Sequence, residues 1–236
     1  MSAGGNKVVL VTGVSSGIGQ ATAQRLLAAD FHVFGTSRKA DLGAVVNGVE
    51  LVRVDVTLDS SVRDAIAEVV KRAGRIDVLV NNVGVGLAGG AEESSADQAR
   101  ALFDINLFGT MRVTNAVLPH MRRQGAGRII NISSVLGFIP APFSALYASS
   151  KHALEGYSES LDHELRGFGI RVSLIEPAYT RTSFDANNRF DGHGAGRLTR
   201  ELLLALRAGA FADDEHRAVS TRRRRSTCFQ RLQMIV

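Results

Sequence analysis

The chain has 236 residues, of which 45% are hydrophobic and 22% are charged. A chain of this length and composition can bury a sizeable core in one undivided α/β domain. No apolar run approaches the roughly 18 residues of a membrane span, so the sequence predicts neither a transmembrane helix nor a secretory signal. The only cysteine, Cys228, excludes an intrachain disulfide and agrees with a reducing, cytoplasmic location.

The net charge of +5 comes from the end of the chain. Six arginines follow Glu215, the last acidic residue, and four of them form the run 222–225. Without these six the net charge is −1. The run could contact phosphates, but it lacks interleaved aromatic residues and an extended basic face. We therefore favour a solvated terminus over a nucleic-acid-binding surface.

Short runs rich in Val and Ile alternate along the chain with longer amphipathic stretches. The runs predict six strands, at 7–13, 31–37, 49–56, 75–82, 127–134 and 169–177. Helical spacing covers 17–29, 59–73, 95–124 and about 146–167, and the expected helix ends are Gly74, Gly125 and Gly167. Continuously apolar strands separated by helices indicate a parallel sheet that is covered on both faces. The predicted fold is therefore doubly wound α/β, of the Rossmann type.

The pattern weakens after Asp185. We expect a dinucleotide-binding and catalytic core over 1–185, followed over 186–236 by a substrate-loop region and the Arg-rich tail. The second region includes a predicted helix near 199–208, and no final strand is predicted there. Its Gly- and Asn-rich start leads us to expect that 178–197 closes over a bound substrate.

The first strand runs directly into TGVSSGIG, residues 12–19, at the start of a helix. Glycines there allow a tight turn and close approach to a pyrophosphate, which the free N–H groups of the helix would bind. The expected cofactor contacts in this turn are Gly13, Ser15, Ser16, Gly17, Ile18 and Gly19. The stretch also matches G-x-S-x-G, the nucleophile elbow of hydrolases. An elbow on the first strand would lack the preceding loop that supplies the oxyanion hole, so we set this alternative aside.

The second strand ends in Ser37, Arg38 and Lys39. An NAD site needs a carboxylate about twenty residues after the glycine turn, whereas an NADP site needs positive charge for the 2′-phosphate. That position here is Lys39, beside Arg38. We therefore expect NADP(H), with Ser37 and Arg38 contacting it; ordinary surface basicity is the alternative.

The stretch YASSK places Tyr147 and Lys151 one helical turn apart, although an exposed surface pair would show the same spacing. Further motifs are DV at 55–56, NNVG at 81–84, Asn106, ISS at 132–134 and EPAYTRT at 176–182. Together with the glycine turn, they make the chain resemble the short-chain dehydrogenase/reductase family over about 7–185. The residues of these motifs are most similar to those of family members that act on steroids, retinoids or other hydrophobic ketones. The chain departs mildly from the family at Val83 and Ala178.

The resemblance implies interconversion of a ketone and a secondary alcohol by hydride transfer. Tyr147 would act as general acid/base, a role in which a nearby positive charge on Lys151 would favour the phenolate. Ser134 would orient the substrate, and Asn106 would link Lys151 to solvent through water; the alternative to this relay is that Asn106 is a locally satisfied polar residue. Further cofactor contacts would come from Asp55, Val56, Asn81, Asn82, Gly84, Tyr147, Lys151, Pro177, Thr180 and Thr182.

We expect a small hydrophobic carbonyl or alcohol substrate, since Phe138 and Ile139 are among the apolar residues between Ser134 and Tyr147. The family resemblance also suggests a homo-oligomer, either a dimer or a tetramer. The six histidines show no metal-ligand spacing, so no metal site is predicted. The alternative function is a cofactor-binding regulator or scaffold without turnover, which would have no need of Ser134, Tyr147 and Lys151 together.

Overall fold

The computed structural model describes residues 6–41, 43–178 and 180. Its strands are β1 (Val8–Val11), β2 (His32–Ser37), β3 (Val45–Val46), β4 (Val49–Arg53), β5 (Val78–Asn81), β6 (Gly127–Ile132) and β7 (Ile170–Ile175). Its α-helices are α1 (Gly17–Ala28), α2 (Asp59–Ala73), α3 (Ala96–Phe103), α4 (Gly109–Gln124) and α5 (Ala145–Leu165). A π-helical segment (Asp104–Phe108), here called the π-turn, joins α3 to α4, and short 3₁₀ turns lie at Val135–Gly137 and Arg166–Phe168.

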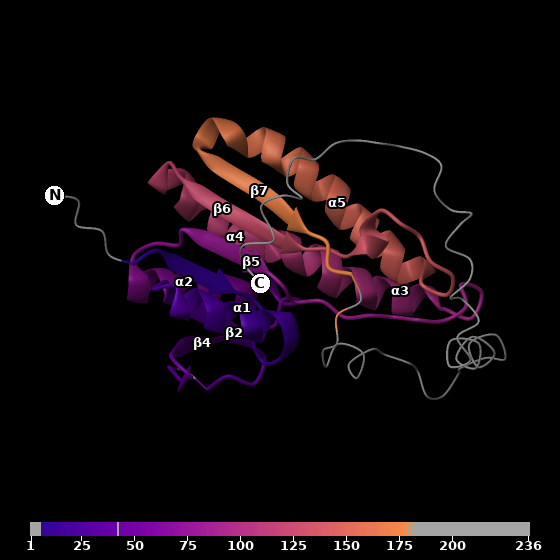
Figure 1. Cartoon of the computed structure of the whole chain (residues 1–236), viewed down its shortest axis with the longest axis horizontal. Coiled ribbons are helices and arrows are strands. Elements are labelled where there is room, and N and C mark those ends of the chain that lie inside the picture. Colours follow the sequence, from indigo (N-terminus) through magenta and orange to yellow (C-terminus); the bar gives the residue numbers. More distant parts are fainter. Residues whose placement is uncertain (1–5, 42, 179, 181–236) are drawn as a thin grey trace. The chain divides into compact units, whose positions relative to one another are not determined.

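One sheet contains all these strands in the order β3-β4-β2-β1-β5-β6-β7 (Figure 1). Every neighbouring pair is parallel except the β3–β4 hairpin, in which Val45 lies opposite Glu50. The strand order reverses beside β1, which lies between β2 and β5. Ligands of doubly wound sheets bind at the carboxyl ends of the strands near this point. The predicted fold and its six strands are confirmed, whereas β3 was not predicted.

The strands are buried on both faces of the sheet. Val8 and Leu10 of β1 belong to the hydrophobic layer that contains residues of α2 and α4. Val9 and Val11 belong to the opposite layer, with Ala23 of α1. Because neighbouring side chains of a strand point to opposite faces, burial of both faces produces the continuous apolar runs seen in the sequence.

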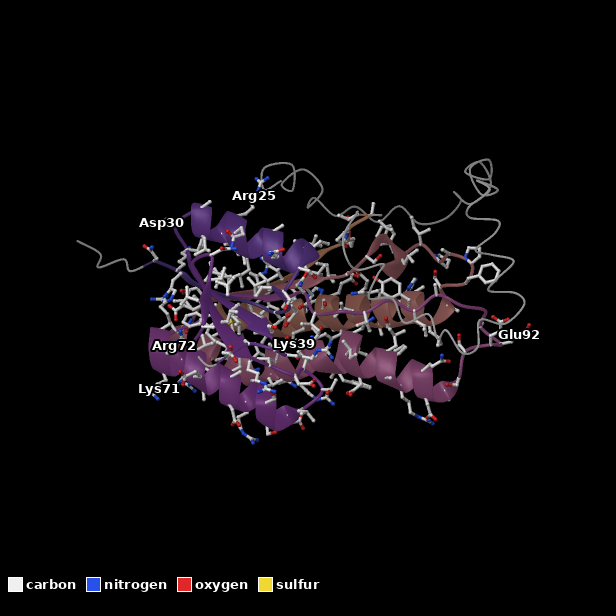
Figure 2. The ribbon with its side chains drawn as sticks, turned by 90° about the horizontal axis from the view of Figure 1, so that it is seen from below. Arg25, Asp30, Lys39, Lys71, Arg72 and Glu92 are labelled. Carbon is white, nitrogen blue, oxygen red and sulfur yellow. The ribbon has the colours of Figure 1, made fainter. Side chains whose placement is uncertain are left out.

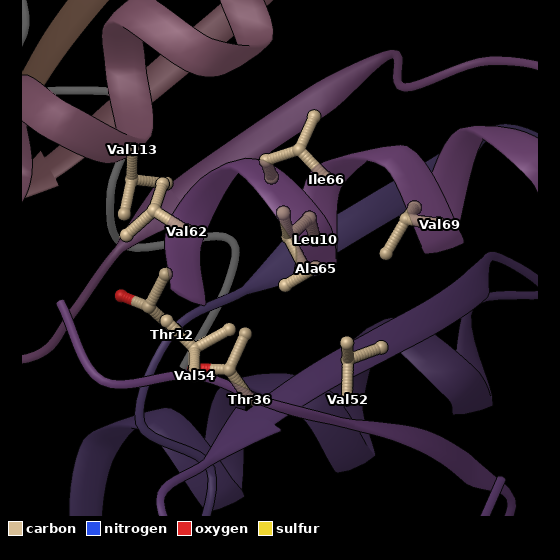
Figure 3. A pocket seen from close by; sticks show the side chains of 10 residues that line it. All are labelled: Leu10, Thr12, Thr36, Val52, Val54, Val62, Ala65, Ile66, Val69 and Val113. Carbon is tan, nitrogen blue, oxygen red and sulfur yellow. The ribbon is translucent and has the colours of Figure 1, made fainter. Parts of the chain in front are cut away.

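A small cavity of about 10 Å³ lies in the first of these layers (Figure 3). It is lined by Leu10, Thr12, Thr36, Val52, Val54, Val62, Ala65, Ile66, Val69 and Val113. Eight of these ten residues are apolar, and the volume is about that of one water molecule. The cavity is a packing gap beneath the glycine turn and is too small for a substrate.

The predicted helix over 95–124 is interrupted by the π-turn. α3 begins with a capping box, in which Ser95 and Gln98 exchange side-chain and backbone hydrogen bonds. After the five residues of the π-turn, the regular α-helical pattern resumes at Gly109. A Cβ on Gly109 would lie 2.8 Å from Val56 Cγ2, so α4 begins in close contact with the loop after β4. π-helical segments often occur at functional sites, and this one contains Asn106.

Several expectations lie outside the described residues. They include Thr182, the helix near 199–208, the arginine run 222–225, Cys228 and the boundary at 185. Among the described helices, none has both the length and the apolar character needed to cross a bilayer. Within the same residues, no group of three or more His, Cys, Asp or Glu side chains could hold a metal ion.

Two of the three glycines that were predicted to end helices do so, and the third prediction needs a correction. Gly74 and Gly125 end α2 and α4 in the left-handed conformation, as predicted. The expectation for Gly167 is wrong, because a 3₁₀ turn follows α5 and the left-handed residue is Gly169, with φ of 71°. A Cβ on Gly169 would lie 2.2 Å from the carbonyl oxygen of Gly125. Glycine is therefore required at 169 both by its φ and by the backbone beside it.

We predict that Gly169→Ala lowers the free energy of unfolding by about 3 kcal/mol, from left-handed strain and the backbone clash together. Gly156→Ala is the matched control, since Gly156 lies inside α5 with no atom within 4 Å of an added Cβ. It should stabilise the protein by about 0.5–1 kcal/mol. Urea denaturation of the two variants measures both effects, and equal midpoints would contradict the close packing at Gly169.

Candidate active site

The glycine-rich turn connects β1 to α1 at the carboxyl edge of the sheet. Gly13 and Gly17 have φ of 72° and 60°, which side-chain-bearing residues rarely adopt. Gly19 is needed for a different reason, because a Cβ there would lie 2.3 Å from both Asn82 Nδ2 and the Gly13 carbonyl oxygen. The three glycines thus allow a tight turn and a close approach between α1 and the segment after β5.

Thr12 and Asn82 hold this turn in place. Thr12 Oγ1 accepts hydrogen bonds from the N–H groups of Asn82 and Val83, at 2.8 and 3.1 Å. The Asn82 amide donates to the carbonyl oxygens of Thr12 and Gly13, at 2.9 and 3.0 Å. Thr36 Oγ1 accepts from the Gly13 N–H at 3.2 Å. The predicted cofactor residue Asn82 therefore supports the turn with its side chain, and Thr12 is a supporting residue that the sequence analysis did not single out.

The amino end of α1 is open to an anion. Its N-cap, Ser16, is extended and makes no side-chain capping hydrogen bond, and the first turn of α1 contains no acidic residue. The exposed Ser15 hydroxyl donates to Ser37 Oγ at 3.0 Å, which connects the turn to the end of β2. Because unpaired N–H groups and the helix dipole both favour negative charge, this end of α1 fits the pyrophosphate of a dinucleotide.

The ends of β2 and β4 bring Arg38 and Asp55 near one another. The Asp55 carboxylate accepts hydrogen bonds from the Thr57 hydroxyl and N–H, at 2.7 and 3.0 Å. These bonds lower the pKa of Asp55 below its ordinary value against the effect of burial, and the positive charge of Arg38 adds to the lowering. Arg38 and Lys39 are exposed. Figure 2 shows Lys39 away from Lys71 and Arg72, which lie in the last turn of α2.

Tyr147 and Ser134 meet at the carboxyl end of β6. Their hydroxyls share a hydrogen bond, and Ser134 Oγ also accepts from the Leu136 N–H at 3.2 Å. Burial raises the pKa of Tyr147 above its ordinary value, and the bond to Ser134 opposes this. The sequence analysis expected positive charge to stabilise the phenolate, whereas in the protein by itself burial has the larger effect and the pKa of Tyr147 is raised. Further positive charge at the site would be needed to lower the pKa of Tyr147.

Lys151 is 5% exposed and lies beneath Tyr147. Its Nζ donates to the Ile132 carbonyl oxygen at 2.9 Å and is 5.8 Å from the centroid of the Tyr147 ring. Burial lowers the pKa of Lys151 to about 8, although the charge of Glu155 acts in the opposite direction. A Cβ on Gly84 would lie 3.7 Å from Lys151 Nζ, so Gly84 leaves room beside the ammonium group.

Asn106 is 1% exposed and joins three segments. Its Oδ1 accepts from the Val85 N–H at 2.9 Å, while Nδ2 donates to the Val85 carbonyl oxygen at 3.0 Å and to Ser150 Oγ at 3.1 Å. Ser150 in turn donates to the Tyr147 carbonyl oxygen at 2.8 Å. The side chain therefore has hydrogen-bond partners within the protein, but they lie 21 and 44 residues away and are not the local partners of the alternative interpretation. A water link from Lys151 to solvent stays a prediction.

The Asn81 side chain faces the interior, which corrects the expectation that it lies along the cofactor. Its Nδ2 donates to Thr114 Oγ1 at 3.0 Å and to Asn131 Oδ1 at 2.9 Å. Asn131 then donates to Ser158 Oγ at 2.8 Å. All four residues are at most 4% exposed. This buried polar chain crosses from β5 and β6 to α4 and α5 beneath the site.

The loops beside Tyr147 are apolar and locally strained. Phe143 has φ of 59°, an unusual value for a bulky side chain, and its carbonyl oxygen accepts from the Gly89 N–H at 2.9 Å. Phe138 and Ile139, directly after the 3₁₀ turn, are each 54% exposed. The Pro177 carbonyl oxygen accepts from the Val135 N–H at 3.2 Å. The loops after β5, β6 and β7 therefore meet around the region between Ser134 and Tyr147.

The other predicted cofactor residues occupy the same edge. Val56 is buried, Ile18 is half-buried in the first turn of α1, and Thr180 is exposed with its hydroxyl donating to the Ala178 carbonyl oxygen at 2.9 Å. The structure thus gathers the predicted residues that it describes at the carboxyl ends of the strands.

A family model of short chain dehydrogenases matches residues 7–191. The chain belongs to this family of oxidoreductases. Its membership confirms the resemblance drawn from the glycine turn, NNVG and YASSK.

Two named relatives show how much of this chain is shared with other proteins. The chain is 41% identical over 181 residues to the 3-ketodihydrosphingosine reductase of Bacteroides thetaiotaomicron, covering 77% of this chain and 66% of the relative. It is 39% identical over 191 residues to human 17-beta-hydroxysteroid dehydrogenase type 1, covering 75% of this chain and 58% of the relative. The chain therefore spans less than two thirds of the length of these curated relatives.

Solved structures agree on the fold and differ in cofactor. A short chain dehydrogenase/reductase from Burkholderia phymatum in complex with NAD is 29% identical, with a TM-score of 0.77 and coverage of 86% of this chain and 80% of the other. Other family structures contain NADP or NADPH. The family thus binds either nicotinamide dinucleotide, and the neighbours do not distinguish between the two for this chain.

We predict that Lys151→Met raises the free energy of unfolding at pH 7. The pKa of Lys151 is about 8 in the folded protein against 10.5 ordinarily. Burial of the charged ammonium group therefore lowers the free energy of unfolding by its full amount below about pH 8, and this cost is lost as the pH rises towards 10.5. The variant also loses the hydrogen bond to Ile132, which reduces the benefit. The net increase in the free energy of unfolding should be about 2 kcal/mol at pH 7 and should be smaller at pH 10. Urea denaturation at both pH values measures this, and a variant less stable at pH 7 would contradict it.

Proposed function

We propose that the protein is an NADP(H)-dependent oxidoreductase that interconverts a ketone and a secondary alcohol, with Tyr147 as general acid/base. The observation that carries the proposal is the Ser134–Tyr147 hydrogen bond above the buried Lys151, at the edge where α1 presents an uncapped amino end. A pair of surface residues would have neither the burial nor these partners.

The residues fit a nicotinamide dinucleotide. The glycine turn and the open end of α1 would hold the pyrophosphate through Gly13, Ser15, Ser16, Gly17, Ile18 and Gly19. Asp55 and Val56 would contact the adenine, while Ser37 and Arg38 would contact the 2′-phosphate. Asn82 and Gly84 line the path towards Lys151, and Pro177, Thr180 and Thr182 would complete the nicotinamide end. When bound, the nicotinamide supplies or accepts the hydride.

The protein's own residues would manage the proton and the orientation of the carbonyl. The raised pKa of Tyr147 keeps its hydroxyl protonated, which is the state needed to donate a proton to a carbonyl oxygen during reduction. Ser134 would donate a hydrogen bond to the same oxygen and orient it. A protonated Lys151 would stabilise the phenolate that remains. Asn106 would keep the catalytic helix in register through Ser150.

The preference for NADP(H) is supported by the end of β2, which carries Arg38 and Lys39 and no carboxylate. A hydrophobic substrate is supported by the exposed apolar side chains of Phe138 and Ile139. Two relatives are named for the ketone and the hydroxysteroid on which they act. Homo-oligomer formation, a cytoplasmic location and the domain boundary at 185 stay predictions from the sequence.

Arg38→Ala should weaken NADPH binding at least tenfold and leave NADH binding within twofold, because a charge-assisted phosphate contact contributes about 1.5–3 kcal/mol. Isothermal titration calorimetry with both cofactors measures the difference. Lys71→Ala is the control, since Lys71 is a basic residue in the last turn of α2, away from Lys39 (Figure 2). Equal dissociation constants of the parent protein for NADPH and NADH would contradict the proposed preference.

Tyr147→Phe should lower turnover 10²- to 10⁴-fold while the protein still folds and binds NADPH, since only the proton donor is removed. Tyr157→Phe makes the same change about 15 Å further along α5 and should leave turnover within twofold. NADPH consumption with a panel of hydrophobic ketones supplies the rates. If the parent binds NADPH but reduces no ketone, the scaffold alternative takes the place of the enzyme.

A further inference from the structure

Arg112, in the first turn of α4, contacts oxygen atoms from three segments. Its Nε donates to Asp59 Oδ1 of α2 at 2.8 Å. Its Nη1 donates to the carbonyl oxygen of Val56 at 3.2 Å and to that of Asp104 at 3.3 Å, and it lies 2.8 Å from Asp104 Oδ1. The side chain is 26% exposed. One guanidinium therefore joins the loop after β4, the start of α2 and the π-turn.

Two of these segments carry residues of the proposed site. Val56 directly follows Asp55, at the proposed adenine end of the cofactor. Asp104 begins the π-turn that contains Asn106, whose side chain is tied to Val85 and to Ser150. Both segments also lie close to Gly109, where a Cβ would be 2.8 Å from Val56 Cγ2 and 3.3 Å from the Asp104 carbonyl oxygen. Arg112 therefore lies where the adenine end and the catalytic end of the site meet.

The chemistry of the contact favours arginine over lysine. The Nε and Nη1 donors of a planar guanidinium point to different acceptors at once, which a single ammonium group cannot reproduce. Burial acts to lower the pKa of Arg112, but the carboxylates of Asp104 and Asp59 raise it above its ordinary value. The group thus keeps its charge, and its two carbonyl contacts fix backbone positions in both segments.

We propose that Arg112 is a positioning residue that holds the Asp55–Thr57 turn and the π-turn in one arrangement, so that adenine binding and the placement of Asn106 depend on the same side chain. The inference rests on the proposed function, because it takes the Asp55–Thr57 turn as part of the cofactor site. This role differs from that of a residue that only links α2 to α4. Loss of such a link would change the free energy of unfolding without changing both the adenine end and the catalytic end of the site.

The test compares Arg112→Met with the parent protein, using the full chain. Two quantities are measured: the dissociation constant of 2′,5′-ADP, which carries only the adenosine end of the cofactor, and kcat for ketone reduction at saturating NADPH. We expect 2′,5′-ADP binding to weaken about tenfold and kcat to fall about tenfold. Arg63→Met is the matched control, because Arg63 lies on α2 with its side chain 72% exposed; both quantities should stay within twofold.

Two results would overturn the proposal: a folded Arg112→Met protein in which both quantities stay within twofold, or one in which only one of them changes. If Arg112→Met does not fold, Arg112→Lys keeps the charge and should still lose at least threefold in both quantities; values within twofold would overturn the need for the guanidinium. If the parent protein binds neither 2′,5′-ADP nor NADPH, the proposed cofactor site fails, which is a different result from any change confined to the Arg112 variants.

Discussion

The close contact between the glycine-rich turn and the end of β5 determines the geometry of the whole edge. β1 and β5 are neighbours at the point where the strand order reverses. Gly19 has no Cβ, so α1 can approach the Asn82 amide, which binds the backbone of the turn. This contact directs the amino end of α1 along the carboxyl edge. It also fixes the start of the segment that continues to Gly84, beside Lys151 and Asn106.

Helix α5 and its neighbours contain polar groups that are costly to bury. Lys151 is nearly inaccessible, and its ammonium group donates to the Ile132 carbonyl oxygen, with Glu155 one helical turn away. Tyr147 is also largely removed from water, which favours its neutral form. Such burial lowers stability and is retained where function requires it. The Asn106–Ser150 pair and the chain from Asn81 to Ser158 are further buried polar groups of this region, and Asn81 Oδ1 is buried there with no hydrogen-bond partner.

The regular elements and the location of the site could be predicted because they follow from local patterns. Continuous apolar runs indicated the buried strands, and strand ends followed by glycine or polar residues indicated the edge where a ligand binds. The same patterns could not predict the β3 hairpin, which has only two residues in its first strand. The ends of helices were harder to predict, because both Gly167 and Gly169 follow α5, and they differ in the φ of the folded chain and in the contact with the backbone of Gly125.

The remaining differences depend on contacts between distant segments. Next to the π-turn, Arg112 donates to the carbonyl oxygen of Val56, which lies 56 residues away in the sequence. The two asparagines of NNVG have opposite roles because the strand pleat turns Asn81 into the interior and Asn82 towards the glycine turn. The pKa of Tyr147 was expected to fall because its positive neighbour is visible in the sequence, whereas the burial that raises it is not.

Transfer of deuterium from cofactor to substrate tests the central claim most directly. The protein is incubated with NADPH that carries deuterium at the transferable position of nicotinamide C4, together with a hydrophobic ketone, and the product alcohol is analysed by mass spectrometry. The account predicts one deuterium on the carbinol carbon of the product. A folded protein that binds NADPH but yields no deuterated alcohol from any hydrophobic ketone would contradict it.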